Sequence, residues 1–329
     1  MKHNEGNIYV TGAYGFIGSN LLYALEQSGI GNVIAIDTFG NGSKWKNVAK
    51  RNSFTYILPE QMEGVLENDL SAQAVIHLGA ISSTTETDVD RLMETNFRLT
   101  CSLFEICQKK GLQFIYASSA ATYGNGENGF EDNEDIIYLN KLRPLNPYGW
   151  SKLLSDKYIA AHHGFDSGSQ IVGLKFFNVY GPNEYHKGEQ ASVIWHFFNQ
   201  ILEKSQINLF KSERKDIPHG RQSRDFVFVD DCINAILIML AHPEVSGLFN
   251  VGTGNSQTYL GIVSAISKSL GREIPYEFID MPYNIKDQYQ YFTQANISKL
   301  HNLGFKPTSL EDGVDTYIKN YLSQTDQYK

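Results

Sequence analysis

Apolar residues follow two alternating patterns along the first half of this chain. Short apolar runs predict strands at residues 8–10, 33–36, 74–78, 113–117 and 171–177. Between the strands, apolar residues at helical spacing predict helices, which run from the first glycine-rich turn to Gly29, over about 96–110 and over about 147–162. Strands that alternate with long helices form parallel sheets with right-handed crossovers. The pattern therefore predicts an α/β fold with a doubly wound parallel sheet.

The alternation loosens beyond Asn178, which predicts a second architecture in the remainder of the chain. We expect residues 1–178 to form the sheet domain and residues 179–329 to form a smaller C-terminal α/β domain. A strand at 226–229 and a helix at 230–241 are expected to return to the sheet, so that about 225–250 belongs with the first domain. The long acidic loop at 124–143 is expected to cover part of the surface.

Composition excludes several classes of protein. Of the 329 residues, 42% are hydrophobic and 19% are charged, as in ordinary globular proteins, and the net charge of -8 argues against a nucleic-acid surface. Three cysteines make neither a disulfide framework nor a metal site, and Cys101 and Cys107 fall in a helical pattern that predicts core packing. Since no apolar run opens the chain or reaches membrane-spanning length, we expect a cytoplasmic protein without a signal peptide.

A glycine-rich turn joins the first strand to the first helix. Gly12, Gly15 and Gly18 form GxxGxxG, which allows a tight turn and brings backbone amides close to a pyrophosphate at a helix N-terminus. Asp37 ends the next strand, about 20 residues further on, where an acidic residue accepts from a ribose hydroxyl. This combination predicts a Rossmann dinucleotide-binding domain.

The residues around Asp37 bear on which dinucleotide binds. Asp37 would repel a 2'-phosphate, which favours NAD. Lys44, Lys46, Lys50 and Arg51 follow closely, and a basic cluster here would neutralise a 2'-phosphate. We predict NADP, with NAD as the alternative; the cluster also fits a solvated charged loop.

Ser119, Tyr148 and Lys152 form a candidate acid–base group. A tyrosine with a pKa near its usual value of about 10 is a poor base at neutral pH. Lys152 follows Tyr148 by one helical turn, so its ammonium is expected to stabilise the phenolate and lower the tyrosine pKa. Ser119 is expected to hold the reacting oxygen. A Tyr-xxx-Lys pair also occurs as a plain surface pair, but the glycine triplet and SSAATYG upstream favour chemistry.

Lys187 is a second proton-transfer candidate, in the run NVYGPNEYHKG at 178–188. One acid–base group suffices for a one-way oxidation. Two groups on different segments favour a reaction that removes a proton on one side and returns one on the other, as an epimerase does. The alternative is that Lys187 only clamps a phosphate.

Taken in order, TGAYGFIG, HLGA, ASSAATYG, YGWSK, NVYGP, RDFVFVDD and FNVGTG resemble the extended short-chain dehydrogenase/reductase superfamily over essentially the whole chain. The narrower runs GAISSTTETD, PLNPYGWSK, FFNVYGPNEYHKG and QYQYFTQA resemble the ADP-L-glycero-D-manno-heptose 6-epimerase family. The resemblance implies an isomerase that inverts C6'' of ADP-D-glycero-β-D-manno-heptose with tightly bound NADP, for lipopolysaccharide core biosynthesis. It also implies a substrate-binding C-terminal domain and a homo-oligomer, a pentamer by family resemblance.

The chemistry agrees with that implication. C6'' bears a secondary alcohol without an acidifying carbonyl beside it, so direct deprotonation of the carbon is not feasible. Transient oxidation gives a ketone, which must present its other face before it is reduced. Tyr148 would act on the oxygen in one orientation and Lys187 in the other, and the sequence does not assign which epimer each serves.

The resemblance assigns further residues to the two ligands. The cofactor positions are Gly12, Gly15, Phe16, Ile17, Gly18, Asp37, Thr38, Lys44, Leu78, Gly79, Ala80, Ile81, Ser82, Asn96, Lys152 and Val179. The substrate positions are Asn178, Glu189, His196, Phe210, Lys211, Ser212, Arg224 and Tyr289. Arg224, a permanently charged fork of donors, suits a diphosphate, whereas His196 alone would be read as a helix-packing residue.

Three stretches depart from the family pattern. YILPEQ at 56–61 has no lysine, although members often carry a second lysine there for the 2'-phosphate. Glu189 stands where a small hydroxyl residue is typical, and residues 213–226 form a longer segment than usual.

Three rival functions stay open on the sequence. A UDP-hexose 4-epimerase, or another nucleotide-sugar epimerase, shares the fold and the Tyr/Lys pair but has no use for Lys187. A 4,6-dehydratase carries an acid–base pair just after its catalytic threonine, and the stretch from Ala120 to Thr122 supplies none. A non-catalytic NADP-binding regulator would be marked by loss of the tyrosine or lysine, and both are present.

Overall fold

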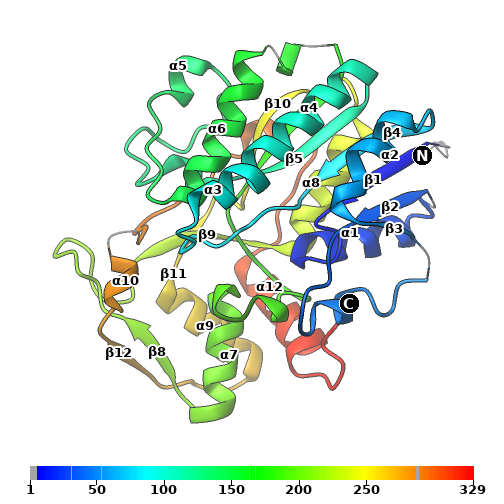
Figure 1. Ribbon diagram of the computed structural model, residues 1–329. Helices are drawn as coiled ribbons and strands as arrows, with labels where there is room; N and C mark the ends of the chain where they lie inside the picture. The colour runs from blue at the N-terminus through cyan, green and yellow to red at the C-terminus, as the bar shows by residue number, and fades with distance from the viewer. Residues whose placement is uncertain (1–5, 31, 53, 163, 167, 287–288) are drawn as a thin grey trace.

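A seven-stranded parallel sheet is the centre of the molecule (Figure 1), whose computed structural model describes residues 6–30, 32–52, 54–162, 164–166, 168–286 and 289–329. In spatial order its strands are β10 (Gly247–Val251), β6 (Ile171–Phe176), β5 (Gln113–Ser119), β4 (Ala72–His77), β1 (Asn7–Thr11), β2 (Val33–Ile36) and β3 (Thr55–Ile57). Every pairing between these strands is parallel. The predicted α/β class with a parallel sheet is confirmed.

The strand order reverses between β1 and β4. From β1 the chain adds β2 and β3 on one side, then crosses to the other side for β4, β5 and β6. Doubly wound sheets bind ligands at such a switch point, in the crevice beyond the carboxyl ends of the strands. The order of strands therefore points to the region after Thr11 and His77.

Helices cover both faces of the large sheet (Figure 1). On one face, α1 (Phe16–Gln27) packs against α8 (Val229–Ala241), and their apolar side chains share a core with β1 and β10. The other face carries α2 (Met62–Asn68), α4 (Leu99–Lys110) and α6 (Pro147–Ala161). Because both faces are covered, central strands such as β6 are buried along their whole length.

Local sequence explains where these helices begin and end. Gly111 adopts a left-handed conformation with φ of 69° and ends α4, as glycine commonly does at this position. Pro147 occupies the first turn of α6, and the side chain of Asn146 accepts a hydrogen bond from the amide of Gly149. These caps set the start of α6 and thereby the place of Tyr148 one residue later.

A smaller assembly lies beside the large sheet. It contains the three-stranded sheet β11 (Ser256–Thr258), β9 (Ser223–Phe228) and β7 (Asn178–Tyr180), and the pair β8 (Ile207–Phe210) and β12 (Tyr276–Ile279). The helices α7 (Val193–Lys204), α9 (Tyr259–Leu270) and α12 (Leu310–Tyr317) pack with them around a separate apolar core.

Short elements complete the described chain. The α-helical ones are α3 (Val89–Leu92), α5 (Ile136–Leu139), α10 (Tyr283–Lys286) and α11 (Ser298–Asn302). The 3-10 segments are η1 (Lys44–Asn47), η2 (Pro59–Gln61), η4 (Ala120–Tyr123), η5 (Gly164–Asp166) and η6 (Tyr185–Gln190), and the π-helical ones are η3 (Met93–Arg98) and η7 (Ile318–Leu322).

The structure corrects two expected elements. The strand predicted at 226–229 is the end of β9, which pairs with β7 and β11, so that only the following helix and β10 return to the large sheet. The helix predicted from 96 begins earlier, with α3 and the π-helical η3 preceding α4. Cys101 and Cys107 are buried in the core, as predicted. The domain boundary at residue 178 stays a prediction.

Each helix in the described part of the chain is too short or too polar to cross a membrane. The expected absence of a signal peptide concerns the start of the chain, and residues 1–5 lie outside the described residues.

Candidate active site

One cavity of about 890 Å³ opens at the switch point of the large sheet. It extends from the ends of β1 and β2 across β4, β5 and β6 to the segment that carries Lys187. All predicted cofactor positions except Asn96 line it, together with Ser119, Tyr148, Lys187, Asn178 and Arg224. The fold therefore brings residues from distant parts of the sequence to one cavity.

The glycine-rich turn forms the floor of this cavity. A Cβ on Gly12 would lie 2.7 Å from the amide nitrogen of Gly79, and a Cβ on Gly18 would lie 2.1 Å from the carbonyl oxygen of Gly12. Both contacts are with backbone, which has little freedom to give way. Gly12 also has a φ of 63°, which favours glycine. The turn leads into the N-terminus of α1, where backbone amides favour an anion, so these residues fit a dinucleotide pyrophosphate.

Asp37 is held at the end of β2 by three donors. Its carboxylate accepts from the amides of Tyr14 (2.9 Å) and Thr38 (2.7 Å), and Lys44 Nζ lies 2.6 Å from Oδ1. Lys44 also donates to the carbonyl of Thr38 at 2.9 Å. This places an acceptor and a cation side by side at the end of the cavity beside β2.

The predicted basic cluster does not act as one group. Lys44 lines the cavity. Lys50 instead pairs with Asp326 at 2.7 Å, Arg51 pairs with Glu26 at 2.8 Å, and Lys46 lies 6.0 Å from the ring centroid of Tyr328. Of the four basic residues expected to neutralise a 2'-phosphate, Lys44 lines the cavity, and the other three contact other parts of the chain.

Asn96 supports the cavity-lining loop at 78–82 from beneath. It is fully buried and lies outside the cavity lining. Its side-chain oxygen accepts from the amide of Ile81 at 2.9 Å, and its nitrogen donates to the carbonyl of Ile81 at 3.0 Å. The position predicted as a cofactor contact thus positions the loop at 78–82 instead.

His77 joins this loop to β1. Thr100 donates to the carbonyl of Asn96 at 2.6 Å, so its hydroxyl oxygen accepts from His77 Nε2 at 3.0 Å. His77 Nδ1 then accepts from the hydroxyl of Thr11 at 2.7 Å, and that hydroxyl accepts from the amide of Gly79 at 2.9 Å. Burial lowers the pKa of His77 to about 3, so the ring is neutral, as this pattern requires.

The three residues of the acid–base group come together where β5 ends beside α6. Tyr148, Lys152 and Ser119 all line the cavity. Burial raises the pKa of Tyr148, and its hydrogen bond with the Ser119 side chain acts in the opposite direction. Lys152 donates to the carbonyl of Ala117 at 2.8 Å, and burial lowers its pKa to about 8. The predicted lowering of the tyrosine pKa by Lys152 is not found in this arrangement, because desolvation dominates.

Lys187 reaches the same cavity from η6. Its ammonium lies 5.7 Å from the ring centroid of Phe16, in the glycine-rich turn. Burial lowers its pKa, and the charge of Glu184 acts in the opposite direction. A buried lysine with a lowered pKa is suited to exchange protons with a substrate.

The predicted substrate residues divide into two groups. Asn178 and Arg224 line the cavity. Arg224 donates to the carbonyl of Gln290 from Nε (3.0 Å) and Nη2 (2.6 Å), and its guanidinium lies 4.8 Å from the ring centroid of Tyr289. The others lie outside the lining: Glu189, His196, Phe210, Lys211, Ser212 and Tyr289. Of these, His196 faces the carbonyl of Glu189 at 3.2 Å, and Lys211 pairs with Asp280 at 2.8 Å.

The lining residues that the sequence analysis left unassigned include His186, Gln190 and Gln290. Gln290 donates to the carbonyl of Gly124 at 2.7 Å, and His186 lies 3.1 Å from the side-chain nitrogen of Asn47. His186 belongs to the motif HKG and Gln290 to the motif QYQYFTQA. Both motifs point to the site, but the sequence does not show which of their side chains reach the cavity. The first residue of the second motif, Gln288, lies outside the described residues.

Comparisons with known proteins agree with this arrangement. Residues 8–252 match the NAD dependent epimerase/dehydratase family. The chain is 43% identical over 324 residues to ADP-L-glycero-D-manno-heptose-6-epimerase of Nitratidesulfovibrio vulgaris, covering 97% of this chain and 99% of the relative. The crystal structure of the Helicobacter pylori ADP-L-glycero-D-manno-heptose-6-epimerase is similar, with a TM-score of 0.79 and 28% identity over 97% of both chains. A UDP-N-acetylglucosamine 4-epimerase from Methanobrevibacter ruminantium gives a TM-score of 0.81 at 27% identity, covering 98% of this chain and 99% of that one.

Proposed function

Because this chain belongs to the NAD dependent epimerase/dehydratase family and, within it, to the ADP-L-glycero-D-manno-heptose 6-epimerases, we propose that it inverts C6'' of ADP-D-glycero-β-D-manno-heptose. One observation carries the proposal beyond the family. Tyr148 and Lys187, on separate segments, line one cavity together with the glycine-rich turn. The product would serve lipopolysaccharide core assembly.

In this proposal, residues of the cavity would supply the proton transfers that such an inversion needs. A bound nicotinamide would accept a hydride from C6'' and return it. The hydroxyl proton on the C6'' oxygen leaves to one acid–base group as the ketone forms. After the ketone has presented its other face, the second group returns a proton to that oxygen. Tyr148 and Lys187 are the two candidates, with Ser119 as the hydroxyl beside Tyr148.

Arg224 is proposed to bind the diphosphate of the nucleotide sugar. Two of its nitrogens donate to the carbonyl of Gln290, and the ring of Tyr289 lies against the guanidinium. A guanidinium has five N–H donors, so further donors remain for phosphate oxygens. These contacts would hold the group in place before the substrate arrives.

The decisive experiment follows H6'' of the ADP-heptose by NMR during incubation with the purified protein in D2O. We expect inversion at C6'' with the hydrogen retained on carbon, since a hydride that leaves and returns within the site does not exchange with solvent. An unchanged C6'' after long incubation would remove the proposal. Conversion of UDP-hexoses, supplied in parallel, with an inert ADP-heptose would favour the 4-epimerase alternative.

We propose NADP rather than NAD as the cofactor, with Lys44 as the cation for the 2'-phosphate. The Lys44 ammonium lies 2.6 Å from Asp37, so it offsets the carboxylate that would otherwise repel a phosphate. Denaturing the purified protein should release NADP, which mass spectrometry identifies. Release of NAD alone would contradict the assignment.

Replacing Lys44 with methionine tests the same proposal by a change of cofactor. We expect the ratio of co-purified NADP to NAD to fall at least about tenfold, the loss expected when a charge-assisted contact of about 1.4 kcal/mol or more is removed. Lys46→Met is the matched control, because this neighbour lies against Tyr328 rather than in the cavity. An equal loss of NADP in both variants would assign the effect to general charge.

A further inference from the structure

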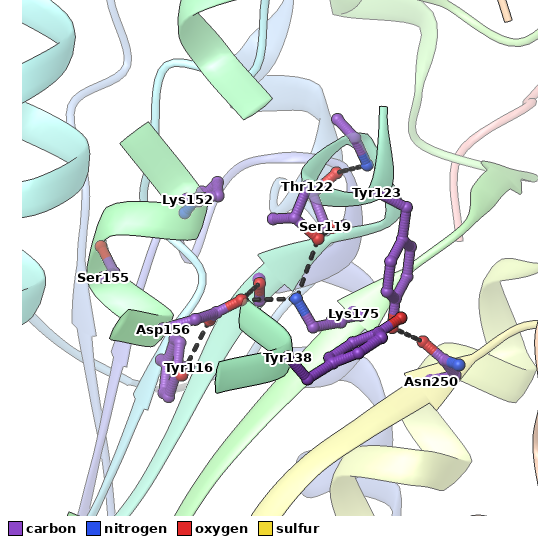
Figure 2. Close-up of polar contacts among 12 residues, drawn as sticks. Tyr116, Ser119, Thr122, Tyr123, Tyr138, Lys152, Ser155, Asp156, Lys175 and Asn250 are labelled. Carbon is purple, nitrogen blue, oxygen red and sulfur yellow. Dashed lines mark hydrogen bonds and ion pairs between the residues drawn. The ribbon is translucent and has the colours of Figure 1, made fainter. Parts of the chain in front are cut away.

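A buried ion pair lies beneath the acid–base group (Figure 2). Lys175 Nζ on β6 lies 2.5 Å from Asp156 Oδ2 on α6, and both side chains are completely buried. Lys175 is the register partner of Ser118 on β5, one residue before Ser119. The pair therefore lies on the strands and helix that carry the candidate catalytic residues.

The carboxylate of Asp156 is fully engaged. It accepts from the hydroxyl of Tyr116 at 2.9 Å, from the hydroxyl of Ser118 at 2.8 Å and from Lys175. All three partners come from β5 and β6, the strands beneath α6. These bonds fix the carboxylate in one orientation.

Lys175 also reaches the turn that follows Ser119. Its ammonium donates to the hydroxyl of Thr122 at 2.8 Å, and that hydroxyl donates to the carbonyl of Ser119 at 2.8 Å. The ring centroid of Tyr123 lies 5.0 Å from the same ammonium. The ion pair is thus connected on one side to α6 and on the other to the segment that presents the Ser119 hydroxyl.

Tyr148, Lys152 and Asp156 follow one another at intervals of one helical turn, on one face of α6. In the described part of the chain, Lys152 has no ion-pair partner; its ammonium donates to the carbonyl of Ala117. Burial lowers the pKa of Lys152, and the charge of Asp156 is the influence that raises it again. Asp156 therefore supplies the negative charge that a buried ammonium needs.

The other groups around Lys152 do not supply that charge. Of the titratable groups nearby, His77 on β4 and Asp156 on the same helix act on Lys152, Tyr148 lies one turn before it on α6, and Tyr116 and Lys175 contact Asp156. His77 is neutral, and burial raises the pKa values of Tyr116 and Tyr148, so both are neutral phenols.

A buried ion pair is weak support for stability, because well-packed apolar residues of similar volume are often as stable. We propose that Asp156, oriented by Lys175, is a positioning residue that keeps Lys152 charged and aligned below Tyr148. The inference rests on the proposed epimerase function, in which Lys152 must stay protonated to serve Tyr148 and the cofactor. Asp156 itself does not line the cavity.

The double variant Asp156→Asn with Lys175→Met tests the proposal. It removes both buried charges together, so it avoids leaving Lys175 unpaired as Asp156→Asn alone would. Loss of the carboxylate lowers the pKa of Lys152, and a group needed in its protonated form is lost as pH rises through its pKa. We expect the alkaline limb of kcat to move down by about one pH unit, and kcat at pH 8 to fall roughly fivefold with KM little changed.

A second measurement does not depend on activity. Competitive acetylation across a range of pH, read by peptide mass spectrometry, reports the pKa of Lys152 directly. We expect a pKa near the value of about 8 in the wild-type protein and a lower one in the double variant. This result would stand even if the substrate were a different nucleotide sugar.

Asp231→Asn is the matched control. Asp231 is also a buried carboxylate, and it accepts from the amide and the hydroxyl of Thr308 at 2.9 Å each, away from the cavity. It should lower Tm but leave the pH profile and the Lys152 pKa unchanged. A double variant with the wild-type alkaline limb and Lys152 pKa would overturn the proposal and leave the pair a structural feature only.

Discussion

Replacing Tyr148 with phenylalanine is expected to lower kcat by roughly 10²-fold or more, the usual contribution of a positioned acid–base group. The change removes one hydroxyl from the cavity and leaves the ring and its packing in place. A loss of 10² corresponds to about 2.7 kcal/mol of transition-state stabilisation. Since the hydroxyl is proposed to act on the reacting oxygen, KM should change little. The rate is measured by NMR from the appearance of the inverted epimer.

Tyr158→Phe is the control for this substitution. Tyr158 lies on the same helix, and its hydroxyl bonds to Glu105 outside the cavity. It should keep a rate close to that of the wild-type protein. A Tyr148→Phe variant whose kcat stays within a few-fold of wild type would show that the phenol does not transfer the proton.

The glycine-rich turn and the Ser119, Tyr148 and Lys152 group could be predicted from the sequence because short-range rules fix them. Backbone atoms after β1 and β4 leave no room for a Cβ at Gly12 or Gly18. Only glycine, which has no Cβ, fits these positions. Tyr148 and Lys152 share a face because they are one helical turn apart. The ends of adjacent parallel strands then bring these two motifs to one edge of the sheet.

The basic cluster shows that local sequence does not determine which side chains face the cavity. Lys44, Lys46, Lys50 and Arg51 stand close together in the chain, but which side chain faces the cavity depends on contacts with distant residues. Lys50 is engaged by Asp326, far away in the sequence. Neither propensity nor spacing carries information about that contact, so the cluster could not be divided correctly in advance.

The ion pair between Asp156 and Lys175 also depends on contacts between distant parts of the chain. Asp156 could have been found, because it continues the spacing of Tyr148 and Lys152 along α6. Its partner Lys175 could not, since the pairing depends on how β6 lies beside β5 and beneath the helix. Read as a sequence, Lys175 is simply a charged residue in an apolar strand.

Burial acts on the two proton-transfer candidates in a complementary way. It raises the pKa of Tyr148 and lowers the pKa of Lys187, so it favours the neutral form of each. A neutral phenol is a proton donor, whereas a neutral amine is a proton acceptor. Burial therefore shifts the pKa values of the two groups in opposite directions, which suits a reaction that must both remove and return a proton.

Replacing Lys187 with methionine is expected to lower kcat by roughly 10²-fold or more, because one of the two proton transfers then lacks its group. Methionine keeps most of the apolar stem that lies near Phe16. If Lys187 only clamped a phosphate, KM would rise instead and kcat would stay near wild type. Lys319→Met, a change at an exposed lysine paired with Asp315, controls for the loss of one positive charge.

The variant that lacks both groups shows whether Tyr148 and Lys187 act in separate half-reactions or in the same transition state. If Tyr148 serves one half-reaction and Lys187 the other, each single variant slows a different step in sequence. The rate of the double variant Tyr148→Phe with Lys187→Met is then set by the slower step and stays within a few-fold of the slower single variant. If both groups act in the same transition state, their losses multiply toward roughly 10⁴-fold. A multiplicative loss would therefore sink the scheme in which the two residues work on opposite faces of the ketone.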